Sequence, residues 1–162
     1  MQLISNLSAA ATAATLLRIL DFSKQHSFDL ANGGCTDLTP VQSYTVTVTA
    51  NQEWTMTATG GLGQTIYRIA SGTCNTFLTY PGAQSGAIAV RSQATTRSTA
   101  TNWTVSLVNP AIPTGPWNII DAVTNAALTA WDHNTLVVST APITLEPLNA
   151  TDTRQQFWFA TF

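Results

Sequence analysis

The chain has 162 residues, a length typical of one domain, but only 9% of them are charged, against about a quarter in an average protein. The formal net charge is −2 and the 6 basic residues are scattered, which excludes a nucleic-acid-binding protein because phosphate contacts require clustered positive charge. No apolar run approaches the roughly 20 residues needed to cross a bilayer, so no membrane span is expected.

The first 15 residues are rich in alanine, serine and threonine and precede the repeated pattern that begins near residue 16. They bear a weak resemblance to a signal peptide, but they lack a basic n-region, and Leu16-Leu17 runs directly into Arg18. We therefore expect residues 1–15 to form an N-terminal segment that is flexible or signal-like. The low charge favours a secreted protein, with a cytoplasmic one as the alternative.

Three apolar tripeptides recur at intervals of 50 residues: Leu17-Arg18-Ile19, Tyr67-Arg68-Ile69 and Trp117-Asn118-Ile119. The same order of features follows each of them, namely a turn, a second apolar strand, a polar stretch and a closing strand that contains tryptophan. The second strands contain Phe28-Asp29-Leu30, Thr76-Phe77-Leu78 and Ala126-Ala127-Leu128-Thr129, and the closing strands cover residues 51–56, 101–105 and 155–159.

Alternation of apolar and polar residues marks individual strands, as at residues 44–48 and 54–57, and threonine enrichment also favours half-buried strands. Glycine and proline turn signals separate the strands, at residues 32–34, 60–61, 71–72, 81–82 and 113–116. Short strands at regular spacing predict an all-β sandwich or barrel, and the threefold repeat favours a β-trefoil with pseudo-threefold symmetry. We expect one domain over residues 16–162. Its repeats of about 50 residues, at about 16–60, 61–110 and 111–162, are called the first, second and third repeat below.

Trp54, Trp103 and Trp158 occupy corresponding places in the closing strands. Residues two apart in a strand face the same side, so each tryptophan and the polar residue two positions before it should both face inward. We expect these tryptophans in the core, and the glutamines before them bonded to neighbouring backbone.

Gln52-Glu53-Trp54 and Gln156-Phe157-Trp158, with Thr101-Asn102-Trp103 as a degenerate copy, resemble the Gln-x-Trp repeats of ricin B-type lectins, also called family 13 carbohydrate-binding modules. The resemblance covers residues 16–162, and the texture of the sequence is similar to that of small fungal members. It implies a β-trefoil that binds sugars, often of the galactose type, with glycans or glycoproteins as partners, without catalysis and without a cofactor.

The family's sugar pocket uses an aspartate on the second strand, a glutamine and an aromatic residue on the third, and an asparagine before Gln-x-Trp. In the first repeat the resemblance assigns these places to Asp29, Gln42, Tyr44 and Asn51, and Asn32 in the following turn completes the predicted carbohydrate-binding set. Asp29 would accept hydroxyl hydrogen bonds, Tyr44 would stack on the sugar ring, and Gln42 and Asn51 would add polar contacts in a shallow site. Alternatively, Asp29 and Asn32 only shape a turn and Tyr44 is an ordinary strand residue.

The other two repeats depart from this pattern. In the second, Leu78 aligns with Asp29 and the place of Tyr44 falls near Val90 or Arg91, so no sugar site of this kind is expected. In the third, Thr129 or its neighbour takes the place of Asp29, and residues 144–147 form the third strand. The turn Trp131-Asp132-His133-Asn134 is either an alternative sugar platform or an ordinary surface tryptophan over a hairpin.

No catalytic or metal-binding motif is present among the 2 histidines and 8 carboxylates, so the chain is not expected to be an enzyme or to bind a metal. Cys35 and Cys74 form either one disulfide or two separate thiols. Two other functions stay open: a β-trefoil protease inhibitor acting through loops 93–100 or 109–116, and an interaction scaffold that binds no sugar. The oligomeric state also stays open, a homo-oligomer included.

Overall fold

The computed structural model describes residues 2–3, 16–59, 66–83, 90–132 and 139–161, and within these ranges the chain is all-β, as predicted. Short 3-10 turns join some of the strands: η1 (Ala31–Gly33), η2 (Ala50–Gln52) and η4 (Thr153–Gln155). No helix of the described residues is long and apolar enough to cross a membrane. The strands are β1 (Gln2–Leu3), β2 (Leu16–Leu20), β3 (His26–Leu30), β4 (Thr39–Thr45), β5 (Trp54–Ala58), β6 (Ile66–Ser71), β7 (Phe77–Thr79), β8 (Thr95–Arg97), β9 (Trp103–Leu107), β10 (Trp117–Asp121), β11 (Ala126–Ala130), β12 (Thr140–Pro147) and β13 (Trp158–Thr161).

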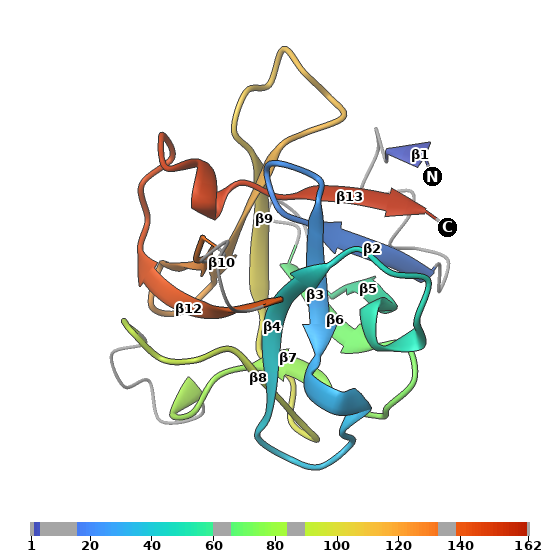
Figure 1. The fold of residues 1–162 in the computed structure, drawn as a ribbon. Coiled ribbons are helices and arrows are strands. Elements are labelled where there is room, and N and C mark those ends of the chain that lie inside the picture. The colour runs from blue at the N-terminus through green and yellow to red at the C-terminus, as the bar shows by residue number, and fades with distance from the viewer. Residues whose placement is uncertain (1, 4–15, 60–65, 84–89, 133–138, 162) are drawn as a thin grey trace.

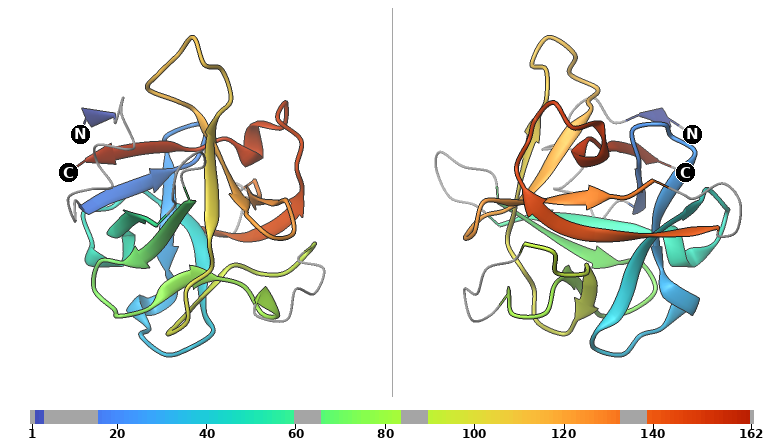
Figure 2. Two further views of the ribbon diagram at one scale, coloured as in Figure 1. Left: turned by 180° about the vertical axis from the view of Figure 1, so that it is seen from behind. Right: turned by 60° about the vertical axis from the view of Figure 1, so that its left-hand side comes forward.

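Antiparallel pairings run in a closed circuit from β13 to β2, β5, β6, β9 and β10. A bridge between Trp117 and Phe157 joins β10 back to the start of β13, with two backbone hydrogen bonds of 2.8 and 2.9 Å. β1 adds to the other edge of β13, so the two ends of the described chain lie side by side (Figures 1 and 2). A closed circuit of this kind leaves the barrel strands without a long free edge.

Three strand pairs, β3–β4, β7–β8 and β11–β12, lie beside this circuit. β4 connects them, because it also pairs with β8 and with β12. Each pair follows a barrel strand through a tight turn, and the first contacts across these turns are Leu20 with Ser27, Ala70 with Phe77, and Ile120 with Ala127. These contacts recur at intervals of 50 residues.

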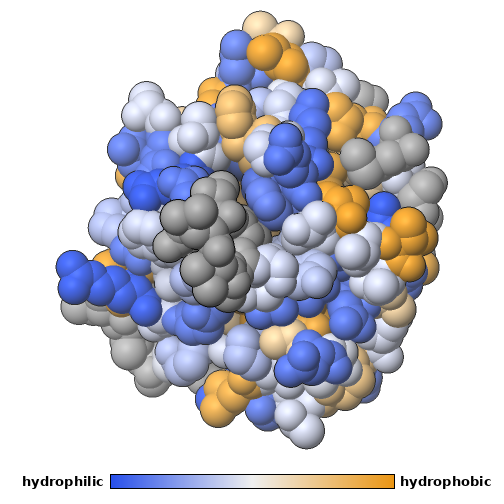
Figure 3. Space-filling model, viewed as in Figure 1, coloured by the Kyte–Doolittle hydropathy of each residue, from blue (hydrophilic) through white to orange (hydrophobic). Residues whose placement is uncertain are grey.

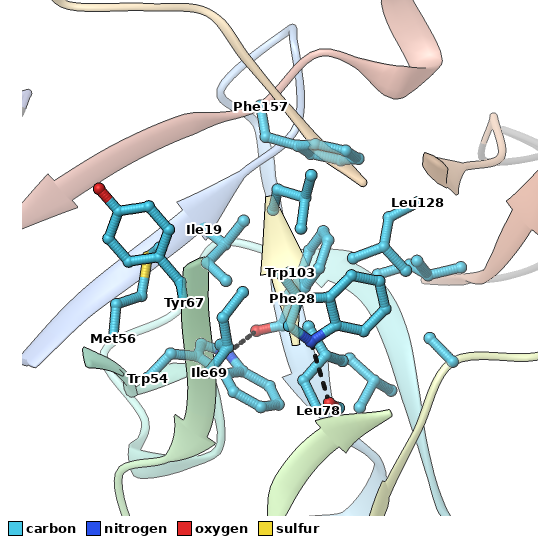
Figure 4. Packing of buried hydrophobic residues seen from close by; sticks show 14 of the residues in the cluster. Ile19, Phe28, Trp54, Met56, Tyr67, Ile69, Leu78, Trp103, Leu128 and Phe157 are labelled. Atoms are coloured by element: carbon cyan, nitrogen blue, oxygen red, sulfur yellow. Dashed lines mark hydrogen bonds between the residues drawn. The ribbon is translucent and has the colours of Figure 1, made fainter. Parts of the chain in front are cut away.

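The core contains the apolar residues that the repeated sequence pattern predicts. Figure 4 shows the rings of Trp54, Trp103, Phe28 and Phe157 converging on the interior. The indole N–H of Trp54 donates to the Phe28 carbonyl at 3.0 Å, and that of Trp103 donates to the Leu78 carbonyl at 3.1 Å. At 0 or 1% exposure the corresponding core residues are Ile19, Ile69 and Ile119; Phe28, Leu78 and Leu128; Val41, Ala94 and Ile143; and Trp54, Trp103 and Phe157.

The predicted place of Trp158 in the core is wrong. Phe157 occupies that place instead, fully buried and edge-on to Phe28 at 5.1 Å between ring centroids. Trp158 is only half-buried; its indole N–H bonds the Phe22 carbonyl at 3.2 Å, and the Lys24 ammonium lies 3.8 Å from its ring centroid. Successive side chains in a strand alternate between faces, so a shift of one residue moves the neighbouring aromatic ring to the surface.

The predicted strand over residues 44–48 ends early, at Thr45. The backbone N–H of Thr47 donates to the side-chain carbonyl of Gln52 at 2.8 Å, which turns the chain into η2. Val48, which the alternation placed on the buried side, is consequently 89% exposed.

Cys35 and Cys74 form a disulfide, which answers the question that the sequence left open. The bridge joins the loop after η1 in the first repeat to the turn between β6 and β7 in the second. Of the predicted N-terminal segment, only Gln2 and Leu3 are described, and they pair with Thr161 and Ala160. Residues 4–15 and the predicted turn at residues 60–61 lie outside the described ranges.

Candidate functional site

Asp29 lies on the outer face of the β3–β4 pair, directly opposite Gln42. Its neighbours Phe28 and Leu30 point into the core, which places Asp29 on the other face of the strand. The carboxylate is nevertheless buried, at 6% exposure. Gln42 donates to its Oδ1 at 3.2 Å and Gln52 donates to its Oδ2 at 3.3 Å.

The Asp29 carboxylate is held by amides alone. Burial raises its pKa above the ordinary value, and the hydrogen bonds from Gln42 and Gln52 offset only part of that rise. In the described part of the chain, no basic side chain forms an ion pair with it. A carboxylate whose pKa is raised by burial is a candidate functional group.

Gln52 ties this carboxylate to the scaffold, as the sequence predicted for the glutamine of a closing strand. Its side-chain carbonyl accepts from Thr47 N–H at 2.8 Å, and its amide donates to the Thr45 carbonyl at 3.0 Å as well as to Asp29. One buried amide therefore connects the end of β4, η2 and the candidate site.

Tyr44 lies on the same face of the β3–β4 pair as Gln42, two residues along β4, and opposite Ser27. The alternate residues Val41 and Ser43 are buried, whereas Gln42 and Tyr44 are half-buried. Tyr44 is therefore not a core residue, and its ring lies on the outer face of the sheet, as the proposed stacking role requires.

Asn32 and Asn51 are brought together by the two 3-10 turns. η1 packs against η2, and Gly33 lies so close to Asn51 that a Cβ added to it would be 2.8 Å from the Asn51 Oδ1. Gly33 has φ +63° and Asn32 has φ 55°, both in the left-handed region that glycine and asparagine tolerate best. Asn32 is exposed and Asn51 half-buried at the end of β3 nearest Asp29.

Gln42 also lines a small hollow of about 250 Å³ with Pro40, Gln93, Thr140, Ala141 and Pro142. The Gln93 amide donates to the Val41 carbonyl at 2.9 Å and closes one side of this hollow. Asp29 and Tyr44 are not among the residues that line it. The structure thus bonds Asp29 to Gln42 and brings the turn of Asn32 against Asn51, while Tyr44 lies on the same face of the sheet as Gln42.

The sequence alignment of the second repeat is wrong by one residue. Leu78 accepts the Trp103 indole bond just as Phe28 accepts that of Trp54, so Thr79, not Leu78, takes the place of Asp29. The Thr79 hydroxyl bonds the Thr101 hydroxyl at 2.6 Å, where the first repeat has the bond from Gln52 to Asp29. The conclusion that this repeat lacks the carboxylate is unchanged.

The counterpart of Tyr44 in the second repeat is also misplaced by the alignment. Phe77 pairs with Arg97 in β8, as Ser27 pairs with Tyr44 in β4, so the counterpart is Arg97 and not Val90 or Arg91. The connection from β7 to β8 is longer than the connection from β3 to β4, so spacing along the chain could not locate this counterpart. Strand pairing alone identifies the correspondence.

In the third repeat Thr129 takes the place of Asp29, as one of the two predicted choices. The Gln155 amide donates to the Thr129 hydroxyl at 3.1 Å and to the Pro147 carbonyl at 3.0 Å, and Gln155 accepts from Asn149 N–H at 2.7 Å. These are the bonds of Gln52, so Gln155 and not Gln156 is its counterpart. Pairing in β12 places Thr144 and Glu146 where the first repeat has Gln42 and Tyr44.

Trp131 and Asp132 follow β11 at the surface, and Trp131 is 37% exposed. His133 and Asn134 of the predicted turn lie outside the described residues. Trp131 and Asp132 line a hollow of about 410 Å³ together with residues from the turn between β2 and β3 and from η4. The sequence did not single out these other residues, because no motif links positions more than 100 residues apart.

No protein-family model and no curated protein sequence matches this chain. Solved structures do resemble it. The Rhizoctonia solani agglutinin is 19% identical with a TM-score of 0.74, covering 93% of this chain and 96% of the agglutinin. The Macrolepiota procera ricin B-like lectin in complex with lactose is 15% identical with a TM-score of 0.73, covering 93% and 97%.

A designed threefold-symmetric protein, ThreeFoil, is 14% identical with a TM-score of 0.73 and covers 91% of this chain and 99% of its own. At these identities the likeness concerns the fold. The closed circuit of strands, the three flanking strand pairs and these structural neighbours agree. The chain has the β-trefoil fold of the ricin B-like lectins.

Proposed function

We propose that this chain is a non-catalytic, lectin-like protein that binds neutral glycans of the galactose type through a site in its first repeat. The site comprises Asp29, Gln42, Tyr44 and Asn51, with Asn32 at its rim. We further propose that residues 16–162 form one domain of three equivalent repeats related by pseudo-threefold symmetry. The recurring contacts at intervals of about 50 residues support this symmetry.

The observation that carries the proposal is the buried carboxylate of Asp29. The same place is occupied by Thr79 and Thr129 in the other repeats, and both hydroxyls bond the closing strand as the carboxylate does. The fold therefore requires a hydrogen-bonding group at this position but not a charge. A buried charge that the fold does not require disfavours folding, which supports a role in binding.

The chemistry of the residues suits a sugar. A carboxylate accepts strong hydrogen bonds from adjacent hydroxyls, and a sugar hydroxyl would replace the half-buried Gln42 amide at Asp29 Oδ1. Asn51 and Asn32 offer both donors and acceptors, and the Tyr44 ring offers an apolar face for the C–H groups of a pyranose. A shallow site of this kind is expected to bind with Kd of about 1 mM, or roughly −4 kcal/mol.

The structural neighbours support the same ligand class. One of them, the Macrolepiota procera lectin, is in complex with lactose. Only 9% of the residues are charged, which suits a neutral ligand. On the face drawn in Figure 3, hydrophobic residues form small patches among hydrophilic ones. Glycoproteins bearing terminal galactose are the partners that we propose.

The decisive experiment titrates lactose into the wild-type protein, Asp29→Asn and Asp37→Asn, followed by two-dimensional NMR of backbone amides. Asn at position 29 keeps the shape but removes the charge, so we expect affinity to fall at least tenfold, about 1.4 kcal/mol. Asp37 is exposed and accepts from Ser98 N–H, a bond that asparagine retains, so Asp37→Asn should bind normally. Equal affinity in the wild type and Asp29→Asn contradicts the site assignment.

A protease inhibitor is the second candidate function, because one of the two loops predicted for that role protrudes from the barrel. Residues 109–116 form a loop that extends beyond the barrel in every view (Figures 1 and 2), with Ile112 44% exposed. Hydrogen bonds from Ile112 N–H to Asn109 and from Gly115 N–H to Ile112 hold it in shape. Inhibition of a serine or cysteine protease that is lost in Ile112→Ala, without any glycan binding, would favour this function.

We propose that the protein is secreted, because Cys35 and Cys74 form a disulfide and disulfides persist mainly in oxidising compartments. Fractionation of the producing cells tests this, and protein found in the cytosol with both thiols reduced would contradict it.

A further inference from the structure

Three triplets of the chain have the form Asn-x-Ser or Asn-x-Thr, the acceptor sequence for N-linked glycans: Asn6-Leu7-Ser8, Asn102-Trp103-Thr104 and Asn149-Ala150-Thr151. Such triplets also arise by chance in a threonine-rich chain, so only their places in the fold can show which of them is suited to carry a glycan. The first triplet lies outside the described residues. The other two lie in very different surroundings.

Asn149 lies in the turn that joins β12 to η4, at the left edge of the molecule in Figure 1. Leu148, Asn149, Ala150 and Thr151 are all exposed, so this stretch leaves open space around the acceptor side chain. Leu148 is 38% exposed although it is a large apolar residue, and a glycan on its neighbour would cover it. A bulky, hydrophilic modification requires a surface turn of this kind.

The turn uses the side-chain oxygen of Asn149 rather than its nitrogen. Asn149 Oδ1 accepts from the Thr151 backbone N–H at 3.1 Å and from the Thr151 hydroxyl at 2.8 Å. These bonds turn the amide with its oxygen toward the chain, and in the described part of the chain no group accepts from Nδ2. Nδ2 is the atom to which an N-linked glycan is attached, so it is available for modification.

The fold does not depend on this nitrogen. The backbone N–H of Asn149 donates to Gln155 Oε1 at 2.7 Å, and its carbonyl accepts from Asp152 N–H at 3.0 Å. In the first repeat the corresponding bond to Gln52 comes from the backbone N–H of Thr47, at 2.8 Å. The same scaffold contact is therefore made without an asparagine, and a glycan on Nδ2 would leave it intact.

The triplet Asn102-Trp103-Thr104 lies at the start of β9 and is much less accessible. Trp103 is fully buried, and Thr104 is paired on both sides, with β6 and with β10. Asn102 is exposed, but its Oδ1 accepts from Arg68 Nε at 3.5 Å. A transferase could bind this triplet in the folded protein only by opening the closed circuit of strands, so folding removes it as an acceptor.

A glycan on Asn149 would also leave the first-repeat site open. β12 pairs with Gln42 and Tyr44 through its first residues, Thr140 to Pro142, whereas Asn149 follows its last residue, Pro147. The glycan would therefore begin at the opposite end of β12 from the proposed sugar site.

We propose that Asn149 is an N-glycosylation site of this protein, with a lipid-linked oligosaccharide diphosphate as the glycan donor. Nδ2 forms a bond to the anomeric carbon of the first sugar, and the bond between that carbon and the diphosphate oxygen breaks. The leaving diphosphate takes the electron pair of that bond, and Nδ2 loses one proton to a base of the transferase. The inference rests on the proposed secretion, because Asn-x-Thr is modified in secreted proteins, and does not require that the chain itself bind sugar.

The test secretes the full chain from yeast behind a cleavable leader, digests it with a peptide-N-glycosidase in H₂¹⁸O, and locates the labelled residues by tandem mass spectrometry. We expect an ¹⁸O-labelled aspartate at position 149, which marks an asparagine that carried a glycan. Asn149→Gln should abolish this label. Thr151→Ala, which keeps the asparagine but removes the hydroxyl of the acceptor sequence, should abolish it too, and Thr151→Ser should retain it.

Asn102→Gln is the matched control, because it removes the other described triplet and should leave the label at position 149 unchanged. A label at position 102 with none at 149 overturns the proposal, and so does a secreted protein without a label at 149. The leader carries the chain into the secretory pathway, so neither result can be attributed to a cytosolic location. Because the measurement does not involve lactose, a failure of lactose binding contradicts the proposed function alone.

Discussion

The first and third repeats use the same scaffold to present different groups. Gln52 and Gln155 each accept from a backbone N–H and donate to the last carbonyl of a neighbouring strand. Each then reaches one further acceptor, which is the Asp29 carboxylate in the first repeat and the Thr129 hydroxyl in the third. Because the hydroxyl satisfies the glutamine equally well, the carboxylate is not needed for folding.

This difference separates scaffold from site within one chain. Both glutamines make the same bonds to backbone, and these bonds hold the fold together. The side chain that accepts the remaining bond differs, being Asp29 in one repeat and Thr129 in the other. A group that varies between otherwise matching environments, and that disfavours folding where it is charged, is a candidate for function.

The largest expected effect distinguishes the two tryptophans of the first and third closing strands. Trp54 is fully buried, so Trp54→Ala should lower the free energy of unfolding by about 3–5 kcal/mol. Trp158 is half-buried on the surface, and Trp158→Ala should lower it by about 1 kcal/mol or less. Urea denaturation measures both. Similar losses for the two variants would place Trp158 in the core and contradict the register described above.

An intermediate effect is expected for the two glutamines. Gln52→Leu and Gln155→Leu each leave a buried N–H and a carbonyl without their partner, so each should lower the free energy of unfolding by about 3 kcal/mol. Lactose titration then separates them, because only Gln52 also holds Asp29. Gln155→Leu should bind lactose at the first-repeat site as the wild type does; weakened binding there in both variants would mean that the repeats are not independent.

The smallest effect is a gain in stability from Asp29→Asn, about 1 kcal/mol at pH 7, of the size seen where a functional polar group is replaced. Burial raises the pKa of Asp29 in the folded state, so its favourable contribution exists below the ordinary pKa and is lost as pH rises through the folded pKa. The advantage of Asp29→Asn should therefore be absent at the lowest pH and grow as pH rises.

Thermal unfolding of the wild type and Asp29→Asn from pH 3 to 7 measures this difference, with Asp37→Asn as the matched control. Asp37 is exposed, so its variant should show no comparable gain as pH rises. A stability advantage of Asp29→Asn that shrinks with rising pH would contradict the account of the buried carboxylate.

Much of the fold could be predicted because the repeat is visible in apolar residues. Ile19, Ile69 and Ile119 were aligned from their spacing, and all are fully buried. The site residues of the first repeat were found from spacing and resemblance, and the structure bonds Asp29 to Gln42 as neighbours across two strands. Their role in binding sugar stays a prediction.

Two of the errors, at Trp158 and at Leu78, are errors of register by one residue. The sequence Gln155-Gln156-Phe157-Trp158 can be read in two frames, since either glutamine is followed two residues later by an aromatic ring. The interval of 50 residues that separates Phe28 from Leu78 also separates Asp29 from Thr79, so the alignment of Leu78 with Asp29 was out of step by one residue. A shift of one residue reverses the face of every side chain, and only pairing with neighbouring strands decides it.

The sequence by itself determined the all-β class, the interval of about 50 residues and most of the core, because these depend on apolar periodicity along the chain. The tertiary structure alone decided that Phe157 and not Trp158 enters the core, that Cys35 and Cys74 are bridged, and that residues 21–26 meet Trp131 and Arg154. These features depend on strand pairing and chain closure, which bring together residues that no local pattern connects.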